Sequence, residues 1–262
     1  MNTENETTAS GRQAVVQALL DARRDRGPLA GAALEGTLTN AEDAYWVQER
    51  VARDSGWHTA GVPRHWKSGG PNRMAVLTHA PLPPAGVWTS PAVAGDHPFN
   101  FRVIEAEVAL RLARDVTPQE ALALTPEQAP QLVDAMTVSI EIVDSRWQEG
   151  AQAPALLKLA DLQSHGALVL GAWQPFVARD WSQQTCVVRI GGGEAQTFRG
   201  THTLADPAWL LPTWLRHVSR SGATVPAGTV VTTGSWCGML KATAGDSVRA
   251  MFEGIGEVQV QL

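Results

Sequence analysis

Residues 104–112, Ile-Glu-Ala-Glu-Val-Ala-Leu-Arg-Leu, decide the fold because an apolar side chain stands at every second position. The positions between them include Glu105 and Glu107. A period of two is typical of a β-strand, in which successive side chains point to opposite faces of the sheet. The fully apolar face must cover a core, and both glutamates point to the other side.

Segments on both sides of this strand predict an α+β architecture. Alternating or short apolar runs predict strands at 137–143, 167–173, 185–190, 195–199, 229–233, 247–252 and 257–262. Apolar spacing and capping signals predict helices at 11–26, from Asn40 through Val51, from Thr117, from Thr125 to Met136, and from Asp206 to Gly222 with a kink at Pro212. We expect an N-terminal portion of helices and loops (1–80) and a β-rich catalytic domain (81–262) in one compact unit.

The composition narrows the possible functions. The 262 residues are 44% hydrophobic and carry a net charge of −5, which excludes a disordered chain and a dedicated nucleic-acid binder. The first ten residues are polar, unlike a signal peptide, and no apolar run has the ~20 residues that a membrane helix needs. We interpret Cys186 and Cys237 as buried thiols and expect a soluble, cytoplasmic protein without membrane partners.

The carboxylates on the strands are candidate metal ligands. Glu105 and Glu107 lie on one strand face, where they are either solvated surface residues or ligands of a divalent cation. Glu141 interrupts an apolar strand, so it points either outward at an edge or inward to a partner. Three carboxylates from two neighbouring strands would suit Mg²⁺ or Mn²⁺, which prefer oxygen ligands. Asp144 and Arg146, which follow closely, form a simple ion pair in the commoner interpretation.

Four stretches resemble the 2-keto-4-pentenoate hydratase branch of the fumarylacetoacetate hydrolase superfamily. They are IEAEVALRLARDV from Ile104, SIEIVDSR from Ser139, LADLQSHGALVLG from Leu159 and GTVVTTGS from Gly228. The resemblance implies a mixed β-roll and an Mg²⁺ or Mn²⁺ ion held by Glu105, Glu107 and Glu141. It also implies a 2-oxo or 2-enol acid as substrate. Glu141 lies five residues before Arg146. This spacing resembles the pattern of the hydratases and decarboxylases rather than that of the acylpyruvate hydrolases.

The same resemblance implies further site residues. Lys67, in Trp66-Lys67-Ser68-Gly69, resembles an active-site lysine that moves a proton during enol–keto tautomerisation, although most lysines are surface residues. Ser164 and Asp161 are implied as catalytic residues. Thr233-Gly234-Ser235 is implied as a substrate-carboxylate site, or else is a plain turn at the end of a strand.

The sequence also departs from the hydratase pattern. Leu162 stands where typical hydratases have Asn, and His65 precedes Trp66 where the family usually has Gly. No carboxylate lies between Lys67 and Asp96, where hydratases usually have an acid. His79 could replace that acid, or it is polar surface. Residues 56–100 contain seven prolines, six glycines and four histidines, which predicts loops and short strands.

These observations predict a metal-dependent hydratase of 2-hydroxy-2,4-dienoates. The alternatives are a decarboxylase of 2-oxo-3-enedioates, a C–C hydrolase of acylpyruvates, and a non-catalytic partner subunit of the same fold. By resemblance we expect a homo-oligomer that can associate with a decarboxylase or hydratase partner.

Among the ten tryptophans, Trp147 and Trp236 lie beside site segments, but we expect them to pack in the core.

Overall fold

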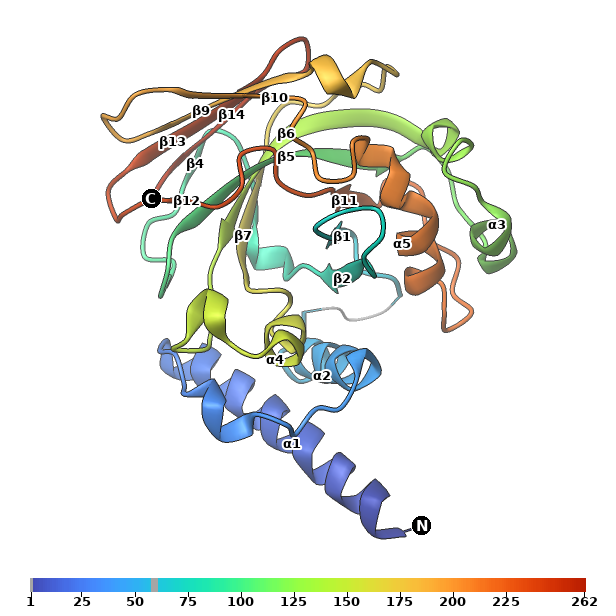
Figure 1. Cartoon of the computed structure of the whole chain (residues 1–262), viewed down its shortest axis with the longest axis vertical. Helices are drawn as coiled ribbons and strands as arrows, with labels where there is room; N and C mark the ends of the chain where they lie inside the picture. The colour runs from blue at the N-terminus through green and yellow to red at the C-terminus, as the bar shows by residue number, and fades with distance from the viewer. Residues whose placement is uncertain (1, 58–60) are drawn as a thin grey trace.

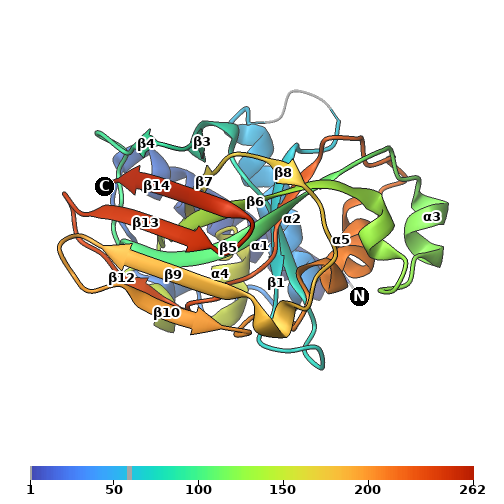
Figure 2. The same ribbon diagram turned by 90° about the horizontal axis from the view of Figure 1, so that it is seen from above.

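The computed structural model describes residues 2–57 and 61–262, so His58, one of the four histidines noted above, lies outside the described residues. The described chain has three layers, and the predicted α+β class is confirmed (Figure 1). A nine-stranded sheet forms the middle layer, a five-stranded sheet covers one side of it, and the helices at 2–25, 41–54 and 155–160 lie on the other side (Figures 1 and 2).

The nine-stranded sheet contains the strand that was quoted first. Its main path is, in spatial order, β2 (Thr78–Pro81), β1 (His65–Gly69), β11 (Val230–Thr232), β5 (Val103–Leu112), β6 (Val133–Val143), β7 (His165–Leu170) and β3 (Val87–Thr89). Two short strands extend it, β12 (Leu240–Lys241) beside β5 and β8 (Gln174–Pro175) beside β6. The five-stranded sheet has the order β10 (Gln196–Arg199), β9 (Thr185–Ile190), β13 (Ser247–Phe252), β14 (Gly256–Gln261) and β4 (Ala92–Val93).

The main core lies between the two sheets. The even-numbered side chains of β5, from Ile104 to Leu112, are at most 2% exposed and join one cluster with Ile140, Val248 and Val258. Trp236 belongs to this cluster and Trp147 to a second one, and both are at most 1% exposed, as core packing predicts. Cys186 and Cys237 are free and buried, as predicted.

The α-helices are α1 (Asn2–Asp25), α2 (Ala41–Asp54), α3 (Pro118–Ala123), α4 (Ala155–Ala160) and α5 (Leu211–Val218). Buried side chains of α3 and α5 join the main core, so these two helices do not belong to the layer below the large sheet. Short 3₁₀ helices are η1 (Gly31–Leu34), η2 (Pro84–Gly86), η3 (Ala129–Leu132), η4 (Gly150–Gln152), η5 (Trp181–Gln183) and η6 (Pro207–Leu210). Side chains of α1, α2 and α4 share a core that includes Val15, Val47 and Leu157, so these three helices pack together.

Most helix boundaries follow the capping signals. The Asn40 side chain accepts a hydrogen bond from Asp43 N at the start of α2. Thr117 and Glu120 form the predicted capping box of α3. Pro212 does not kink a long helix; it lies in the first turn of α5, where its missing N–H costs nothing. The predicted segment from Asp206 is therefore two helices, η6 and α5.

The helix predicted from Thr125 to Met136 is wrong. Only the 3₁₀ turn η3 forms there, and β6 begins at Val133. Pro130 cannot donate a backbone hydrogen bond inside a helix, and its ring clashes with the preceding turn. Pairing of Met136 with Leu110 on β5 buries the segment in the sheet instead, so the tertiary pairing outweighs the local capping signal.

The stretch from residue 56, where loops and short strands were predicted, contains the first two strands. Strand β1 and most of strand β2 lie within residues 1–80 and are part of the nine-stranded sheet, while the division of the chain at residue 80 stays a prediction. Among the described residues, no helix combines the length and the apolar character needed to cross a membrane.

Candidate active site

The three predicted metal ligands converge on one face of the large sheet. Glu105 pairs directly with Glu141 across β5 and β6, and Glu107 follows two residues later on β5. Each of the three glutamates offers one carboxylate oxygen, and these oxygens lie within 4.8 Å of one another. The glutamates face away from the apolar core because strand side chains alternate. We call this cluster the glutamate triad.

The triad is not a solvated surface. Glu107 is 2% exposed, Glu141 is fully buried and Glu105 is half-buried, so the alternative of a solvated strand face does not hold. Burial, followed by repulsion from the other glutamates, raises the pKa of Glu105 to about 8 and that of Glu107 to about 7. Buried carboxylates are expensive unless a positive charge neutralises them. The triad therefore has the oxygen ligands and the charge deficit of a divalent-cation site.

Two basic side chains contact the third glutamate. Lys67 Nζ on β1 lies 2.5 Å from Glu141 Oε1, and His165 Nδ1 lies 3.1 Å from the same oxygen. Burial opposes the charge on Lys67, but Glu141 and Glu105 outweigh it and raise the pKa of the lysine. Burial lowers the pKa of His165, so a neutral ring donates its Nδ1–H to the carboxylate. Glu141 Oε2 makes no hydrogen bond to any described residue and can accept a cation.

The Thr233-Gly234-Ser235 turn positions the second glutamate. Thr232 Oγ1 donates a hydrogen bond to Glu107 Oε2, and Gly234 N lies 3.0 Å from the same oxygen. The Thr233 and Ser235 hydroxyls donate to the carbonyls of Val108 and Gly238 at 2.6 and 2.7 Å. Gly234 has a φ of +105°, which only glycine adopts readily. The structure thus ties the turn to Glu107, and its contact with substrate stays a prediction.

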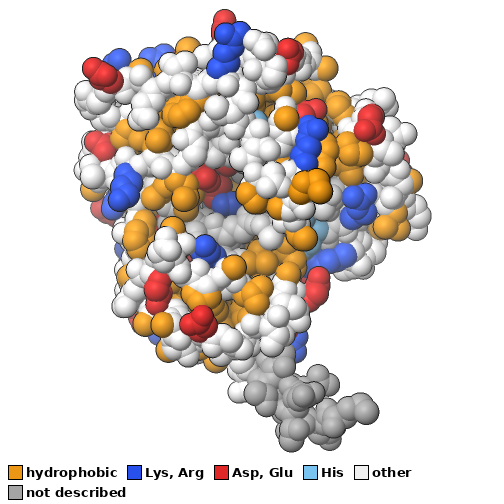
Figure 3. Space-filling view, in the orientation of Figure 1, with side chains coloured by type: hydrophobic (Ala, Val, Ile, Leu, Met, Phe, Trp, Pro, Cys, Tyr) orange, Lys and Arg blue, Asp and Glu red, His pale blue; other side chains and the backbone are white. Residues whose placement is uncertain are grey.

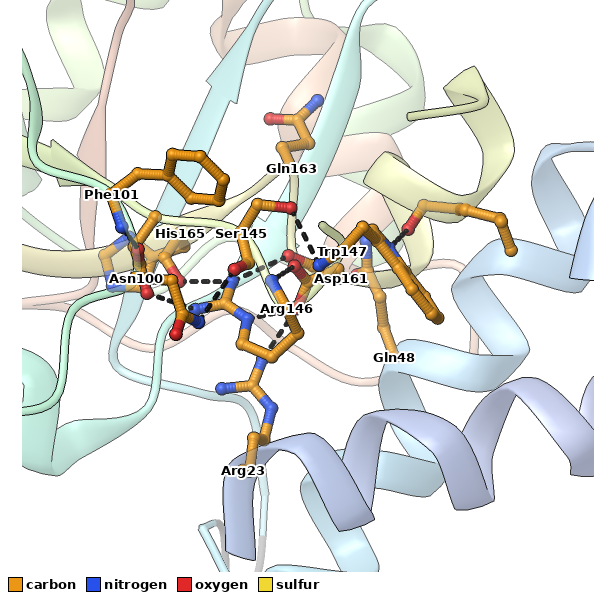
Figure 4. Close-up of polar contacts among 12 residues, drawn as sticks. Arg23, Gln48, Asn100, Phe101, Ser145, Arg146, Trp147, Asp161, Gln163 and His165 are labelled. Carbon is orange, nitrogen blue, oxygen red and sulfur yellow. Dashed lines mark hydrogen bonds and ion pairs between the residues drawn. The ribbon is translucent and has the colours of Figure 1, made fainter. Parts of the chain in front are cut away.

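Asp161 lies in a buried ion network with Arg146 and Arg23 (Figure 4). Its Oδ1 accepts from Arg146 Nε at 2.7 Å and from Arg23 Nη2 at 3.0 Å, and its Oδ2 accepts from Arg146 N at 2.9 Å. The Arg146 guanidinium also reaches Asp144 Oδ2, at 3.5 Å. The predicted pair of Asp144 and Arg146 is therefore part of a larger network that includes α1.

A left-handed turn connects Asp161 to Lys67. Leu162, Gln163 and Ser164 have φ values of +53°, +54° and +58°. Each non-glycine residue in this conformation costs roughly 1–2 kcal/mol, so the surrounding contacts must hold the turn. The Gln163 carbonyl oxygen lies 3.2 Å from Lys67 Nζ. Ser164 is 8% exposed, and its hydroxyl makes no hydrogen bond to the part of the chain that the structure describes.

His79 cannot replace the missing loop acid. It pairs with Ser68 across β1 and β2, and the Ser68 Oγ–His79 Nδ1 distance is 2.8 Å. Ser68 and Lys67 are neighbours on β1, so their side chains point to opposite faces. His79 therefore lies on the face away from the triad, where it packs against His217 at 4.7 Å between ring centroids.

Three groups at the site were not predicted from the sequence: the His165 ring, the Thr232 hydroxyl and the Gln163 carbonyl. His165 is the first residue of β7 and Thr232 the last residue of β11, and both are polar residues at the ends of otherwise apolar strands, a weaker signal than the one that identified Glu141. The role of Gln163 depends on a backbone atom and a left-handed turn, which no side-chain pattern indicates.

The space-filling view shows a hollow in the middle of the face drawn, with acidic and basic side chains inside it (Figure 3).

Comparison with known proteins identifies the family. The model of the fumarylacetoacetate (FAA) hydrolase C-terminal family matches residues 65–262. The 2-keto-4-pentenoate hydratase 1 of Dechloromonas aromatica (strain RCB) is 31% identical over 157 residues, which are 59% of this chain and 58% of that protein. The match thus spans less than two thirds of that relative. The 2-keto-4-pentenoate hydratase 2 of the same strain is 27% identical over 256 residues, 94% and 95% of the two chains.

A solved structure shows the same fold over the whole chain. The 4-oxalocrotonate decarboxylase from Pseudomonas putida G7, complexed with magnesium and adipate, superimposes with a TM-score of 0.83. The alignment covers 100% of this chain and 98% of that one at 17% identity. This likeness shows the fold, and the family match over residues 65–262, which begins at the first residue of β1, establishes that the chain belongs to the fumarylacetoacetate hydrolase family.

Proposed function

We propose that the protein is a divalent-metal-dependent hydratase that acts on 2-hydroxy-2,4-dienoates, the enols of 2-oxo-4-enoic acids. The observation that carries the proposal is the convergence of three carboxylates within 4.8 Å beside a buried lysine. Relatives named 2-keto-4-pentenoate hydratase support the substrate class. The product would be a 4-hydroxy-2-oxo acid, formed from one dienol and one water.

The glutamate triad would hold Mg²⁺ or Mn²⁺. Oxygen ligands suit these hard cations, and Glu141 Oε2 has no described partner that a cation would displace. When bound, such an ion supplies Lewis-acid stabilisation for negative charge on the C2 oxygen of a 2-oxo acid. Thr232 and Gly234 N would keep Glu107 oriented, and His165 would do the same for Glu141.

Lys67 would move the proton that interconverts dienol and unsaturated ketone. Its Nζ is held by Glu141 Oε1 and the Gln163 carbonyl, so its position is defined before substrate arrives. Ser164 would contact the substrate from the adjacent turn, and the Thr233-Gly234-Ser235 turn would face the substrate carboxylate. Asp161, whose oxygens are occupied by arginines, would support the site by position rather than by proton transfer.

Decarboxylation of a 2-oxo-3-enedioate is the second candidate. It needs the same stabilised enolate but no group that activates water. The lack of a carboxylate between Lys67 and Asp96 favours it, because His79, the remaining candidate for that task, faces away from the triad. The missing acid would equally fit a non-catalytic partner subunit, which the buried triad with its lysine argues against. Self-association, or association with a hydratase or decarboxylase, stays a prediction, which the molar mass from light scattering would test.

The experiment is a pair of ultraviolet assays on the metal-free protein with Mg²⁺ or Mn²⁺ added back. Loss of dienol absorbance with 2-hydroxypenta-2,4-dienoate, together with the 4-hydroxy-2-oxo acid as product, would support the hydratase. Release of CO₂ from 2-oxohex-3-enedioate without hydration would support the decarboxylase instead. Turnover of neither compound, nor of an acylpyruvate, by protein that has bound metal would refute the enzyme proposal.

A further inference from the structure

We propose that Arg23, in the last turn of α1, is a positioning residue that fixes Lys67 through Asp161 and the left-handed turn at 162–164. The inference rests on the proposed function for its catalytic meaning, because Lys67 has a chemical role only there. The restraint of the Lys67 side chain by α1, a helix distant in sequence, does not depend on any substrate.

The first contact joins the helical layer to the loop before β7. Arg23 Nη2 lies 3.0 Å from Asp161 Oδ1, although 138 positions separate the two residues in the chain. The Arg23 guanidinium also lies over the Trp57 ring, 5.0 Å from its centroid. The arginine is therefore held between an aromatic ring and a carboxylate that is fully buried, and Figure 4 shows it reaching from α1 toward this carboxylate.

The second step runs through the backbone of the turn. Asp161 ends α4, and its carbonyl oxygen accepts a hydrogen bond from Ser164 N at 2.9 Å. The three residues after Asp161 have positive φ values and none is glycine, so the turn relaxes toward ordinary backbone unless its ends are fixed. The Asp161 side chain fixes one end, and the hydrogen bond from Asp144 N to Ser164 O, at 2.8 Å, fixes the other.

The third contact reaches the lysine. At the middle of the turn, the Gln163 carbonyl oxygen lies 3.2 Å from Lys67 Nζ. Movement of the turn would remove this acceptor and leave Lys67 held by Glu141 alone. The path Arg23–Asp161–turn–Lys67 is thus an unbroken series of contacts between a helix outside the family-matched segment, residues 65–262, and the centre of the site.

Arg23 is the member of this path that can be changed without removing the fold. Arg146 has a side chain only 8% exposed and donates to both Asp161 and the His165 carbonyl, so its loss would leave buried groups unpaired. The Arg23 side chain is 21% exposed, and without it Asp161 keeps its bonds to Arg146. Arg12 is a matched control on the same helix, because it also lies over a tryptophan, at 4.9 Å from Trp46, and pairs with an aspartate, Asp43.

The test measures how readily Lys67 reacts in the metal-free protein. The chain has only three lysines, so brief reductive methylation followed by peptide mass spectrometry reports each of them, with Lys158 and Lys241 as internal references. We expect Arg23→Met to raise the methylation rate of Lys67 relative to the references about tenfold, which corresponds to ~1.4 kcal/mol in the opening equilibrium. Arg12→Met should leave the ratio unchanged, and Arg23→Lys should restore most of the wild-type value.

Two results would overturn the proposal: an unchanged Lys67 ratio in Arg23→Met, or an equal rise in Arg12→Met, which would indicate general loosening of α1. If Arg23→Met does not fold, the comparison of Arg23→Gln with Arg12→Gln decides in the same way, because glutamine also lacks the positive charge. In an active enzyme, Arg23→Met should lower kcat about tenfold, by the same ~1.4 kcal/mol, at unchanged Mg²⁺ affinity. An inactive wild-type protein would refute the proposed function, while the methylation ratios would still decide the role of Arg23.

Discussion

The two faces of strands β5 and β6 are both buried, yet they do opposite things for the molecule. On one face, Ile104 and Ile140 are fully buried in the apolar core between the sheets. On the other, Glu107 and Glu141 are nearly or fully buried with their charges close together. Burial of the first face stabilises the fold, whereas burial of the second costs stability in the metal-free protein. We infer that the second face is kept for function.

The largest expected effect comes from removing one ligand of the triad. Glu107→Gln keeps the shape and the acceptor for Thr232 and Gly234 N but removes a charge. Since Lewis-acid stabilisation is worth several kcal/mol, turnover should fall on the order of a thousandfold. Glu194→Gln, at an exposed position in the β9–β10 turn, is the control. Full activity of Glu107→Gln would show that the triad is not the metal site.

Neighbouring residues of β5 offer a direct contrast between the faces. Ile104→Ala should lower the free energy of unfolding by about 2–5 kcal/mol, because it leaves a cavity in the core. Glu105→Gln should leave the metal-free protein as stable or more stable at pH 8, since a neutral amide replaces a half-buried acid whose pKa is raised to about 8. Urea denaturation with EDTA measures both. A loss of several kcal/mol in Glu105→Gln would contradict the account.

The pH dependence tests the same face. Burial, then repulsion within the triad, raises the pKa values of Glu105 and Glu107 to about 8 and about 7, and Lys67 opposes both shifts. The folded metal-free protein therefore binds more protons than the unfolded chain, so its stability falls as pH rises from about 5 to about 8. Cation binding needs the deprotonated glutamates.

The Tm gain on adding Mg²⁺ should therefore increase from about pH 6 to about pH 8. Thermal unfolding with MgCl₂ and with EDTA, measured across this range, checks the expectation. Thr232 and His165 also contact the triad, so the reference variant must keep both of them and lose one ligand. Glu105→Gln is that variant, and its Tm gain on adding Mg²⁺ should be absent. A gain that is equal at both pH values would exclude titration of the triad.

The smallest effect is expected where the strand pair is exposed. Arg111 and Asp134, near the far ends of β5 and β6, form an ion pair at 2.8 Å with side chains 36% and 41% exposed. Such exposed pairs contribute about 0.2–1 kcal/mol, so Asp134→Ala should change the urea midpoint slightly and turnover not at all. A large loss of activity in this variant would mean that the whole strand pair, and not the buried acid face, is sensitive to change.

The contrast between the faces also explains what the sequence could predict. The alternation in 104–112 predicted β5 and its buried face, and Glu141 was notable because it interrupts an apolar run. The helix expected from Thr125 was wrong because pairing of β6 with β5 depends on contacts that local signals do not contain. The resemblance implied a catalytic role for Asp161, but its pairing with Arg23 joins residues 138 positions apart, and no local pattern indicates it.

The most direct test of the central claim is a titration of the metal-free protein with Mn²⁺, followed by electron paramagnetic resonance of the free ion. The account predicts one tight site per chain in the wild-type protein and its loss in Glu107→Gln, with Glu194→Gln like wild type. No binding to the wild-type protein, or equal binding to Glu107→Gln, would contradict the assignment of Glu105, Glu107 and Glu141 as the ligands of a divalent cation.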